Sequence, residues 1–248
     1  MLAAGVGSRL YGDDGRQPPK ALMTFEGATL LRRHIDILIS LGIEGLALVV
    51  GYRKDELLRE VAAAGANDYV TPIVNPDFRD GPIVSFWMAR QALTAGSEVL
   101  FMDADVLYHP RLLRRLIDSP HRNCFLFDRV LDPGVDPVRI CIRDGIPIEF
   151  GKSVEGSFDQ IGEWPGFLKM TAPIAGRMVD AASGLIAAGR RELAYEPAMR
   201  EVLLSEPAGT FGFEDISDVP WIEIDFPTDL TRAQTEILAR IRTFDQAS

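Results

Sequence analysis

Cysteine, histidine and tryptophan are scarce in this sequence of 248 residues, which contains two cysteines, three histidines and three tryptophans. Cys124 and Cys141 lie in apolar surroundings without the spacing of metal ligands, so no zinc site is expected. We interpret both as buried thiols of a protein in a reducing compartment. His34, His109 and His121 show neither the spacing of a catalytic triad nor that of a metal site, and we assign them no chemistry.

An excess of positive charge is also missing. The 26 Lys and Arg residues are outnumbered by 36 Asp and Glu residues, which gives a net charge of −10. A general binder of nucleic acid or of an anionic membrane needs a basic face, so neither partner is expected. An acidic protein that handles anions must gather its cations locally or recruit a metal ion.

Long uninterrupted apolar runs are absent. The longest apolar stretch, Ile35 to Val50, contains Asp36, Glu44 and two glycines, and it therefore does not span a membrane. Met1 leads directly into Leu-Ala-Ala-Gly without a basic segment, so no signal peptide is visible and we expect a cytoplasmic protein. The first strand is short, so an extension of the native chain before Met1 stays open, as does the oligomeric state.

The first half of the sequence alternates between helical periodicity and short apolar runs. Helices are predicted at 30–42, 53–65, 81–93 and 109–119, with strands at 46–52, 69–75 and 98–106. Such alternation predicts an α/β fold with a doubly wound, mostly parallel mixed sheet. With 47% hydrophobic and 25% charged residues, the composition is ordinary for a soluble globular protein.

The pattern changes after Asn123. Strands are predicted at 125–130, at 138–150 and onward to about Met170, with Asp144-Gly145 as a tight hairpin turn. Helices follow at 173–188 and 196–204, and the segment 221–243 reads as a strand, a turn and a long helix. We expect a single domain over residues 1–248, in which the second half adds a mixed sheet to the first.

The chain opens with a glycine-rich loop, LAAGVGSRL, followed by PPKAL. Closely spaced glycines let backbone N–H groups approach a ligand, and Arg9 and Lys20 add positive charge, so the loop suggests a cradle for a polyphosphate. It lacks the Gly-Lys-Ser/Thr of a Walker loop and the third glycine of the dinucleotide fingerprint. A flexible turn is therefore the alternative for the loop taken alone. The intervening residues 11–19 read as an exposed flap.

Acidic residues follow two of the predicted strands. Asp103 and Asp105 come at the end of EVLFMDADV, and Asp225 follows WIEI. Ligands of open α/β sheets bind beyond the carboxyl ends of the strands, so these acids and the opening loop are expected to converge on one edge. A pair of hard carboxylate ligands suits Mg²⁺. The alternatives are solvated loop acids for the first pair and, for Asp225, an N-cap of the last helix.

The opening motif resembles the signature of the nucleotidyltransferases that activate sugar phosphates, phosphocholine, inositol phosphate and related molecules. The resemblance extends over nearly the full chain and implies a Rossmann-like fold of the nucleotide-diphospho-sugar transferase type. It implies the reaction NTP + R-phosphate → NDP-R + pyrophosphate, with Arg9 and Lys20 as the catalytic residues. Arg9 and the loop amides would hold the β- and γ-phosphates, and Lys20 would stabilise charge on the α-phosphate and the acceptor. The nucleotide-binding loop would comprise Leu2, Ala3, Ala4, Gly5, Gly7, Ser8 and Arg9.

A second segment, NPDFRDGPIVSFWMAR, is similar to the segment of the family that faces the base and the ribose. The resemblance assigns Asp80, Gly81 and Ser85 to nucleotide binding. Members with an Asn-rich version differ from this sequence, which leaves the choice of base less defined than the phosphate site. An ordinary helix start is the alternative for this segment.

The same resemblance assigns Asp105 and Asp225 as ligands of Mg²⁺, with Asp103 as an auxiliary ligand. The E-I-D pattern before the last helix is closest to cytidylyltransferases, so CTP is the favoured nucleotide. Asp229 is assigned to the dipole of that helix.

The acceptor is expected to bind in the half formed by residues 123–248, whereas residues 1–122 form the nucleotide-binding half. The candidate acceptor residues are Lys152, Trp164, Phe167, Tyr195 and Glu196. Aromatic rings and a carboxylate suit a cationic amine, so we expect a small phosphate or phosphonate with an amino or trimethylammonium group, such as phosphocholine or 2-aminoethylphosphonate. A sugar or inositol phosphate stays open, and core aromatics with surface acids are the alternative reading of these residues.

Two other functions remain open. One is a molybdopterin nucleotidyltransferase, which shares the LAAG loop but usually has a shorter loop before the lysine and lacks the E-I-D ending. The other is a non-catalytic nucleotide-binding regulator with the same fold. A pure binder has no need of two metal-binding acids, which argues against the regulator.

Overall fold

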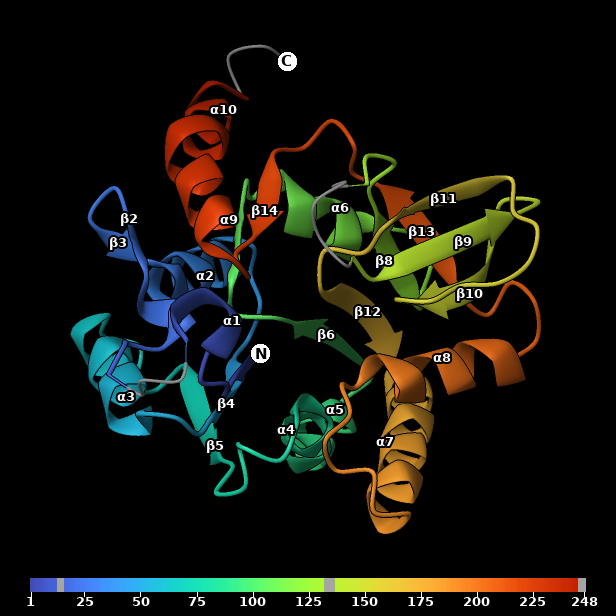
Figure 1. Cartoon of the computed structure of the whole chain (residues 1–248), viewed down its shortest axis with the longest axis horizontal. Helices are drawn as coiled ribbons and strands as arrows, with labels where there is room; N and C mark the ends of the chain where they lie inside the picture. The colour runs from blue at the N-terminus through green and yellow to red at the C-terminus, as the bar shows by residue number, and fades with distance from the viewer. Residues whose placement is uncertain (13–15, 132–136, 245–248) are drawn as a thin grey trace. The chain divides into compact units, whose positions relative to one another are not determined.

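The computed structural model describes residues 1–12, 16–131 and 137–244 (Figure 1). The chain divides into two compact units. The first unit comprises Met1–Asp80, Asp103–Pro110 and Val219–Ser248, and the second comprises Gly81–Met102 and Arg111–Asp218. Each unit is therefore assembled from segments that are distant in the sequence. These units are structural. The predicted division into a nucleotide-binding half, residues 1–122, and an acceptor-binding half, residues 123–248, concerns function and stays a prediction. The middle of the predicted flap, residues 13–15, lies outside the described residues.

The first unit is built on a parallel sheet that confirms the predicted alternation. β1 (Leu2–Ala3), β4 (Leu46–Val50) and β5 (Val70–Val74) lie in this order and run parallel. The connections contain α2 (Leu30–Ser40) and α3 (Lys54–Ala63). Leu2 also forms a parallel bridge with Asp103, so the start of β1 lies beside the acidic turn.

Helix α2 shows how the sequence specifies this unit. Thr29 caps its N-terminus, because the threonine Oγ1 accepts the N–H of Arg32 at 3.0 Å. The helix buries one face at the spacing of three and four residues that helical geometry requires. That face consists of Leu30, Leu31, His34, Ile35 and Leu38, so one histidine stands among aliphatic side chains.

A short antiparallel pair completes the first unit. β7 (Val106–Tyr108) pairs with β14 (Trp221–Glu223), and the chain then continues into α9 (Pro227–Arg232), a π-helical turn (Ala233–Ile237) and α10 (Leu238–Thr243). The predicted strand 98–106 is divided, because β6 (Glu98–Met102) ends before Asp103. The sequence did not predict the short elements near the loop, which are α1 (Ser8–Tyr11), a 3-10 helix (Lys20–Leu22), β2 (Thr24–Phe25) and β3 (Ala28–Thr29).

The second unit contains a mixed sheet in the order β13-β8-β12-β6. β12 (Phe167–Thr171) is antiparallel to β6 and to β8 (Cys124–Phe127), while β13 (Gly212–Asp215) is parallel to β8. The helices of this unit are α4 (Pro82–Met88), α5 (Arg90–Leu93), α6 (Arg111–Asp118), α7 (Ala172–Ala187) and α8 (Glu196–Ser205). The predicted helix 81–93 is thus interrupted at Ala89.

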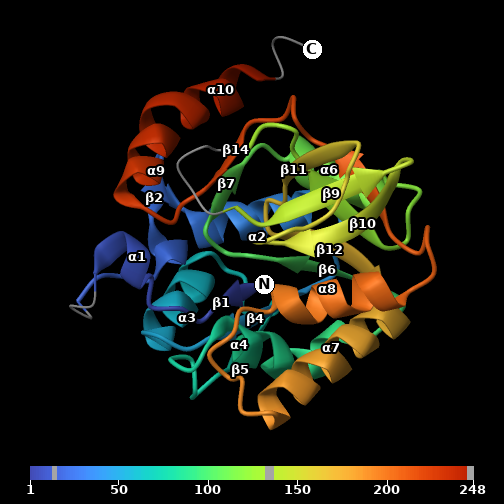
Figure 2. The ribbon, with the colours of Figure 1, turned by 45° about the vertical axis from the view of Figure 1, so that its right-hand side comes forward.

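A three-stranded antiparallel sheet in the order β10-β9-β11 completes the second unit (Figure 2). It consists of β9 (Arg139–Arg143), β10 (Ile146–Gly151) and β11 (Gln160–Glu163). The predicted hairpin turn is confirmed, since Asp144 and Gly145 connect β9 to β10 with φ angles of 50° and 74°.

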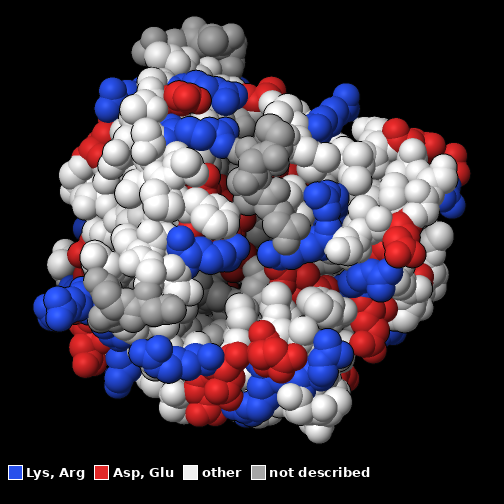
Figure 3. All heavy atoms as spheres, viewed as in Figure 1, with Lys and Arg blue, Asp and Glu red and all other residues white. Residues whose placement is uncertain are grey.

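The surface mixes charges of both signs. On the face seen in Figure 3, Lys and Arg side chains alternate with Asp and Glu side chains. Among the described residues, no helix combines the length and the apolar character needed to cross a membrane.

Candidate active site

The glycine loop of the first unit connects β1 to α1. The carbonyl oxygen of Ala4 accepts the N–H of Tyr52 at 3.0 Å, which fixes the end of β1. Gly7 adopts a φ of 73° at the N-terminus of α1, a conformation that favours glycine. A Cβ at Gly7 would lie 3.1 Å from Cγ of Lys20, so the missing side chain also lets the lysine pass close to the loop.

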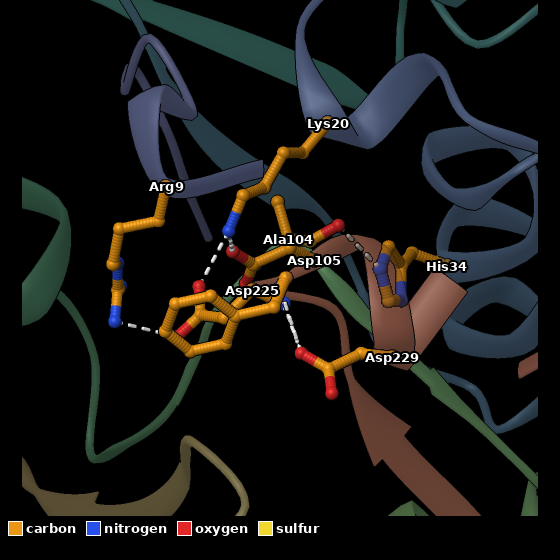
Figure 4. A network of polar contacts seen from close by, with 8 residues as sticks. Arg9, Lys20, His34, Ala104, Asp105, Asp225 and Asp229 are labelled. Carbon is orange, nitrogen blue, oxygen red and sulfur yellow. Dashed lines mark hydrogen bonds and ion pairs between the residues drawn. The ribbon is translucent and has the colours of Figure 1, made fainter. Parts of the chain in front are cut away.

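Lys20 connects two carboxylates of the first unit (Figure 4). Its Nζ lies 2.9 Å from Oδ2 of Asp105 and 2.6 Å from Oδ1 of Asp225. The lysine side chain is only 11% exposed. Burial alone would lower the pKa of Lys20, but the two carboxylates outweigh it together and raise that pKa above its usual value. Lys20 is therefore a permanent cation in this site.

Arg9 binds the same aspartate from the solvent side. Its Nη1 lies 2.7 Å from Oδ2 of Asp225, while 54% of the arginine side chain is exposed. The guanidinium carbon lies 5.9 Å from the centre of the Phe226 ring. Arg9 can thus leave Asp225 and turn to an anionic ligand without first being pulled out of the interior.

Glu223 is a member of this cluster that our sequence analysis missed. Carboxylate oxygens of Asp105, Glu223 and Asp225 all lie within 4.8 Å of one another. Burial raises the pKa of Glu223 well above its usual value, and Asp105 and Asp225 raise it further. The E-I-D pattern contained the signal, because residues two apart on an extended chain point to the same side.

The three carboxylates fit a divalent cation. They offer hard oxygen donors, which magnesium prefers. Burial and the neighbouring carboxylates raise the pKa of Glu223, whereas the Lys20 ammonium lowers it. Asp103 is not one of the three grouped residues, but its charge contributes to the raised pKa of Glu223. The role of Asp103 as an auxiliary ligand stays a prediction.

The backbone on both sides of Asp105 is held in place. The carbonyl oxygen of Asp105 accepts the N–H of Ile224 at 3.0 Å, which connects the acidic turn to the chain that leads into Asp225. The carbonyl oxygen of Ala104 lies 3.1 Å from Nε2 of His34 (Figure 4).

Asp229, and not Asp225, provides the side-chain cap at the N-terminus of α9. Oδ2 of Asp229 accepts the N–H groups of Asp225 and Phe226 at 3.0 and 2.7 Å. This agrees with the helix role expected for Asp229. The carboxylate of Asp225 instead faces Lys20 and Arg9, so the capping alternative for Asp225 does not describe its contacts.

The residues predicted to face the base and the ribose fall in both units. Asp80 belongs to the first, where its N–H donates to the carbonyl oxygen of Asp77 at 3.0 Å. Gly81 and the buried Ser85 belong to the second. A Cβ at Gly81 would lie 2.4 Å from the carbonyl oxygen of Arg191, so glycine is required there for backbone packing. Nucleotide binding by these three residues stays a prediction.

Most of the predicted acceptor residues lie in the core of the second unit. Trp164, Phe167 and Tyr195 are 3%, 0% and 6% exposed. The indole Nε1 of Trp164 donates to the carbonyl oxygen of Phe167 at 2.7 Å, and Tyr195 packs against Phe101 with ring centres 4.9 Å apart. These contacts favour the alternative of core aromatics for the three rings.

Lys152 and Glu196 are the predicted acceptor residues outside that aromatic core. Lys152 is exposed just after β10, and Glu196 is the first residue of α8. A role in acceptor binding stays a prediction for all five residues.

The fold and the site define a class of protein. A strand, a glycine loop and a short helix, with carboxylates beyond neighbouring strands, form a nucleotide-binding α/β fold of the nucleotide-diphospho-sugar transferase type. The CTP:phosphocholine cytidylyltransferase from Streptococcus pneumoniae has the same fold, with a TM-score of 0.73, 21% identity and coverage of 94% of this chain and 95% of that chain. This likeness confirms the predicted fold class.

The chain belongs to the family of MobA-like NTP transferase domains, whose profile matches residues 1–132. It is 29% identical over 244 residues to the CMP-5'-(3-aminopropyl)phosphonate synthase of Streptomyces rubellomurinus, which covers 94% of this chain and 37% of the relative. It is also 29% identical over 242 residues to the bifunctional IPC transferase and DIPP synthase of Rubrobacter xylanophilus, which covers 96% of this chain and 51% of the relative. The chain thus spans about half or less of these two relatives.

Proposed function

We propose that this protein transfers CMP from CTP to a small phosphate or phosphonate acceptor and releases pyrophosphate. The observation that carries the proposal is the contact of Lys20 with both Asp105 and Asp225 beside the glycine loop. The chain that contains this site belongs to the NTP transferase family. The choice of CTP is supported by the relative that is named a CMP-phosphonate synthase.

The reaction needs no protein nucleophile. An oxygen of the acceptor's phosphate or phosphonate forms a bond to the α-phosphorus of CTP, and the bond from that phosphorus to the oxygen bridging to the β-phosphate breaks. The electron pair of the broken bond leaves with pyrophosphate. Catalysis then consists of holding the two anions in line and stabilising the shifting charge.

Each charged side chain of the site has a place in this scheme. Arg9 and the N–H groups of the loop hold the β- and γ-phosphates, and Lys20 stabilises the charge that develops around the α-phosphorus. Asp105, Glu223 and Asp225 would hold Mg²⁺, with Asp103 in an auxiliary role. The Mg²⁺ ion supplies positive charge to the phosphate oxygens when it is bound.

Pyrophosphate release tests the proposal and separates it from the alternatives. The full chain with Mg²⁺ is offered CTP, UTP, GTP or ATP, each with phosphocholine, 2-aminoethylphosphonate, 3-aminopropylphosphonate, inositol 1-phosphate or glucose 1-phosphate. We expect release with CTP and one of the amino-bearing acceptors.

Release only with GTP and molybdopterin, added as a further arm, would establish the molybdopterin alternative. Nucleotide binding without any release would establish the regulator. Lys54→Ala is a suitable control, because this lysine is 45% exposed and is 4.0 Å from its nearest ion-pair partner, the adjacent Asp55.

A further inference from the structure

His34 is a polar residue on the buried face of α2, where the other buried residues are aliphatic. It is 1% exposed and lies on the buried face of α2, between leucine and isoleucine side chains. A buried imidazole is costly unless both ring nitrogens have hydrogen-bond partners. Both nitrogens do, and the two partners lie on either side of Asp105 in the sequence, at Ala104 and Tyr108.

The chemistry of the partners fixes the tautomer of this histidine. The carbonyl oxygen of Ala104 can only accept, so Nε2 of His34 carries the proton and donates over 3.1 Å. Nδ1 then has a free electron pair and accepts the hydroxyl proton of Tyr108 over 3.2 Å. Burial lowers the pKa of His34 to about 4, so the ring keeps this neutral form at neutral pH.

These bonds act on the backbone that carries the Asp105 carboxylate. The peptide before Asp105 is held by His34, and the peptide after it is held by the N–H of Ile224. Two fixed peptide planes determine the direction of the Cα–Cβ bond between them. That bond directs the Asp105 carboxylate toward Lys20, at 2.9 Å, and into the group with Glu223 and Asp225.

We propose that His34 is a positioning residue of the active site, whose Nε2–H holds the Ala104 carbonyl and thereby directs the carboxylate of Asp105 toward a shared divalent cation. The inference rests on the proposed function, because it concerns the cation that the three carboxylates would hold. His34 itself touches neither substrate nor metal. Its removal loosens a ligand, and partners of this kind cost about 10- to 100-fold in metal affinity or activity when they are removed.

Two amide substitutions separate this role from simple core filling. In His34→Gln the amide reaches the place of Nε2 and can still donate to Ala104, but the acceptor for Tyr108 is lost. In His34→Asn the shorter amide reaches the place of Nδ1 and can still accept from Tyr108, but the donor to Ala104 is lost. Each variant leaves one buried contact unmade, so both should lower the melting temperature.

The measurement is the affinity of the nucleotide-free full chain for Mn²⁺ alone, followed by isothermal titration or by electron paramagnetic resonance. We expect His34→Asn to bind Mn²⁺ about 10-fold more weakly than the wild type, and His34→Gln to stay within about threefold. In the turnover assay, the Mg²⁺ concentration for half-maximal activity should rise for His34→Asn alone. Equal Mn²⁺ affinity in the two variants, or a greater loss in His34→Gln, would overturn the proposal.

A third variant keeps the proposal testable if His34→Asn does not fold. Tyr108→Phe removes the hydroxyl that bonds to Nδ1 and leaves the bond to Ala104 intact, so it should lower stability and preserve Mn²⁺ affinity. A 10-fold loss of Mn²⁺ affinity in Tyr108→Phe or in His34→Gln would overturn the assignment. Because Mn²⁺ binding needs no turnover, a wild type that binds Mn²⁺ but releases no pyrophosphate would refute the proposed function and leave this comparison valid.

Discussion

The ammonium nitrogen of Lys20 lies 2.6 Å from Oδ1 of Asp225, and Arg9 lies 2.7 Å from the other oxygen of the same carboxylate. Asp225 is therefore bound by one buried and one exposed cation, since the Lys20 side chain is 11% exposed and that of Arg9 is 54% exposed. Both cations would also be needed by the phosphates of a nucleotide. Without a nucleotide, the carboxylates hold Lys20 and Arg9 in defined positions.

Replacing Lys20 should have opposite effects on turnover and on cation binding. Lys20→Met should lower kcat by about 100-fold, because a preorganised charge near the reacting phosphorus is lost. Without nucleotide, the same variant should bind Mn²⁺ more tightly than the wild type, because Nζ lies between the oxygens of Asp105 and Asp225 that the cation would use. Turnover within a few-fold of the wild type, or weaker Mn²⁺ binding, would contradict this prediction. Lys54→Met is the matched control.

Asp225→Asn should raise the Mg²⁺ concentration needed for activity by about 10-fold or more, with a small change in melting temperature. Breaking a buried ion pair usually costs about 3–5 kcal/mol. Here Lys20 keeps Asp105 as a partner, and the variant removes one of the negative charges that, together with burial, raise the pKa of Glu223. Thermal melts and Mg²⁺ titrations of turnover measure the two effects. A variant that is strongly destabilised but keeps its Mg²⁺ dependence would show that Asp225 has a structural role only.

The stability of the protein should depend on pH through His34. Burial lowers the pKa of this imidazole from 6.5 to about 4. Between these values the unfolded chain binds a proton that the folded chain does not, so the free energy of unfolding falls as the pH falls through this window. Above pH 6.5 the histidine has no such effect. The loss by pH 4 is on the order of 3 kcal/mol, since one pKa unit corresponds to about 1.4 kcal/mol.

Urea unfolding of the wild type and of His34→Gln at pH 7, 6 and 5 measures this contribution. The difference in unfolding free energy between the two proteins should shrink as the pH falls, because the glutamine does not titrate. Parallel pH curves for the two proteins would refute the prediction. His121→Gln serves as a control, since His121 is exposed.

The sequence predicted the elements whose signal is local. The five buried positions of α2 repeat at helical spacing, and Asp144-Gly145 forms the hairpin turn that its residue types require. The pairing of β14 with β7 joins residues more than a hundred positions apart, and no local pattern reports such a contact. The short helix α1 depends on the positive φ of Gly7 and on the contact with Lys20, which are also tertiary features.

The same limit explains which site residues were recognised. Arg9 and Lys20 stand out as the cations of the opening motif, and Asp105 and Asp225 stand out because they follow predicted strands. Glu223 gave no such signal, because it lies in β14 and a charged residue in a strand ordinarily faces solvent. Trp164, Phe167 and Tyr195 are buried, and composition alone does not distinguish an aromatic pocket from an aromatic core. Their predicted role in acceptor binding is untested.

The acceptor prediction can be tested at Glu196, the carboxylate among the predicted acceptor residues of the second unit. Glu196 begins α8, and the positive end of a helix stabilises a carboxylate in its first turn. A cationic acceptor would gain a charge–charge contact there. Glu196→Gln should therefore raise the KM for phosphocholine or aminophosphonate acceptors by about 10-fold. This corresponds to the loss of one charged contact of about 1.4 kcal/mol. The KM for CTP should stay nearly unchanged. Glu201→Gln, on the exposed side of the same helix, is the matched control. Equal KM changes in the two variants, or efficient use of inositol or hexose phosphate with no turnover of phosphocholine or aminophosphonates, would rule out recognition of the acceptor's cation by Glu196.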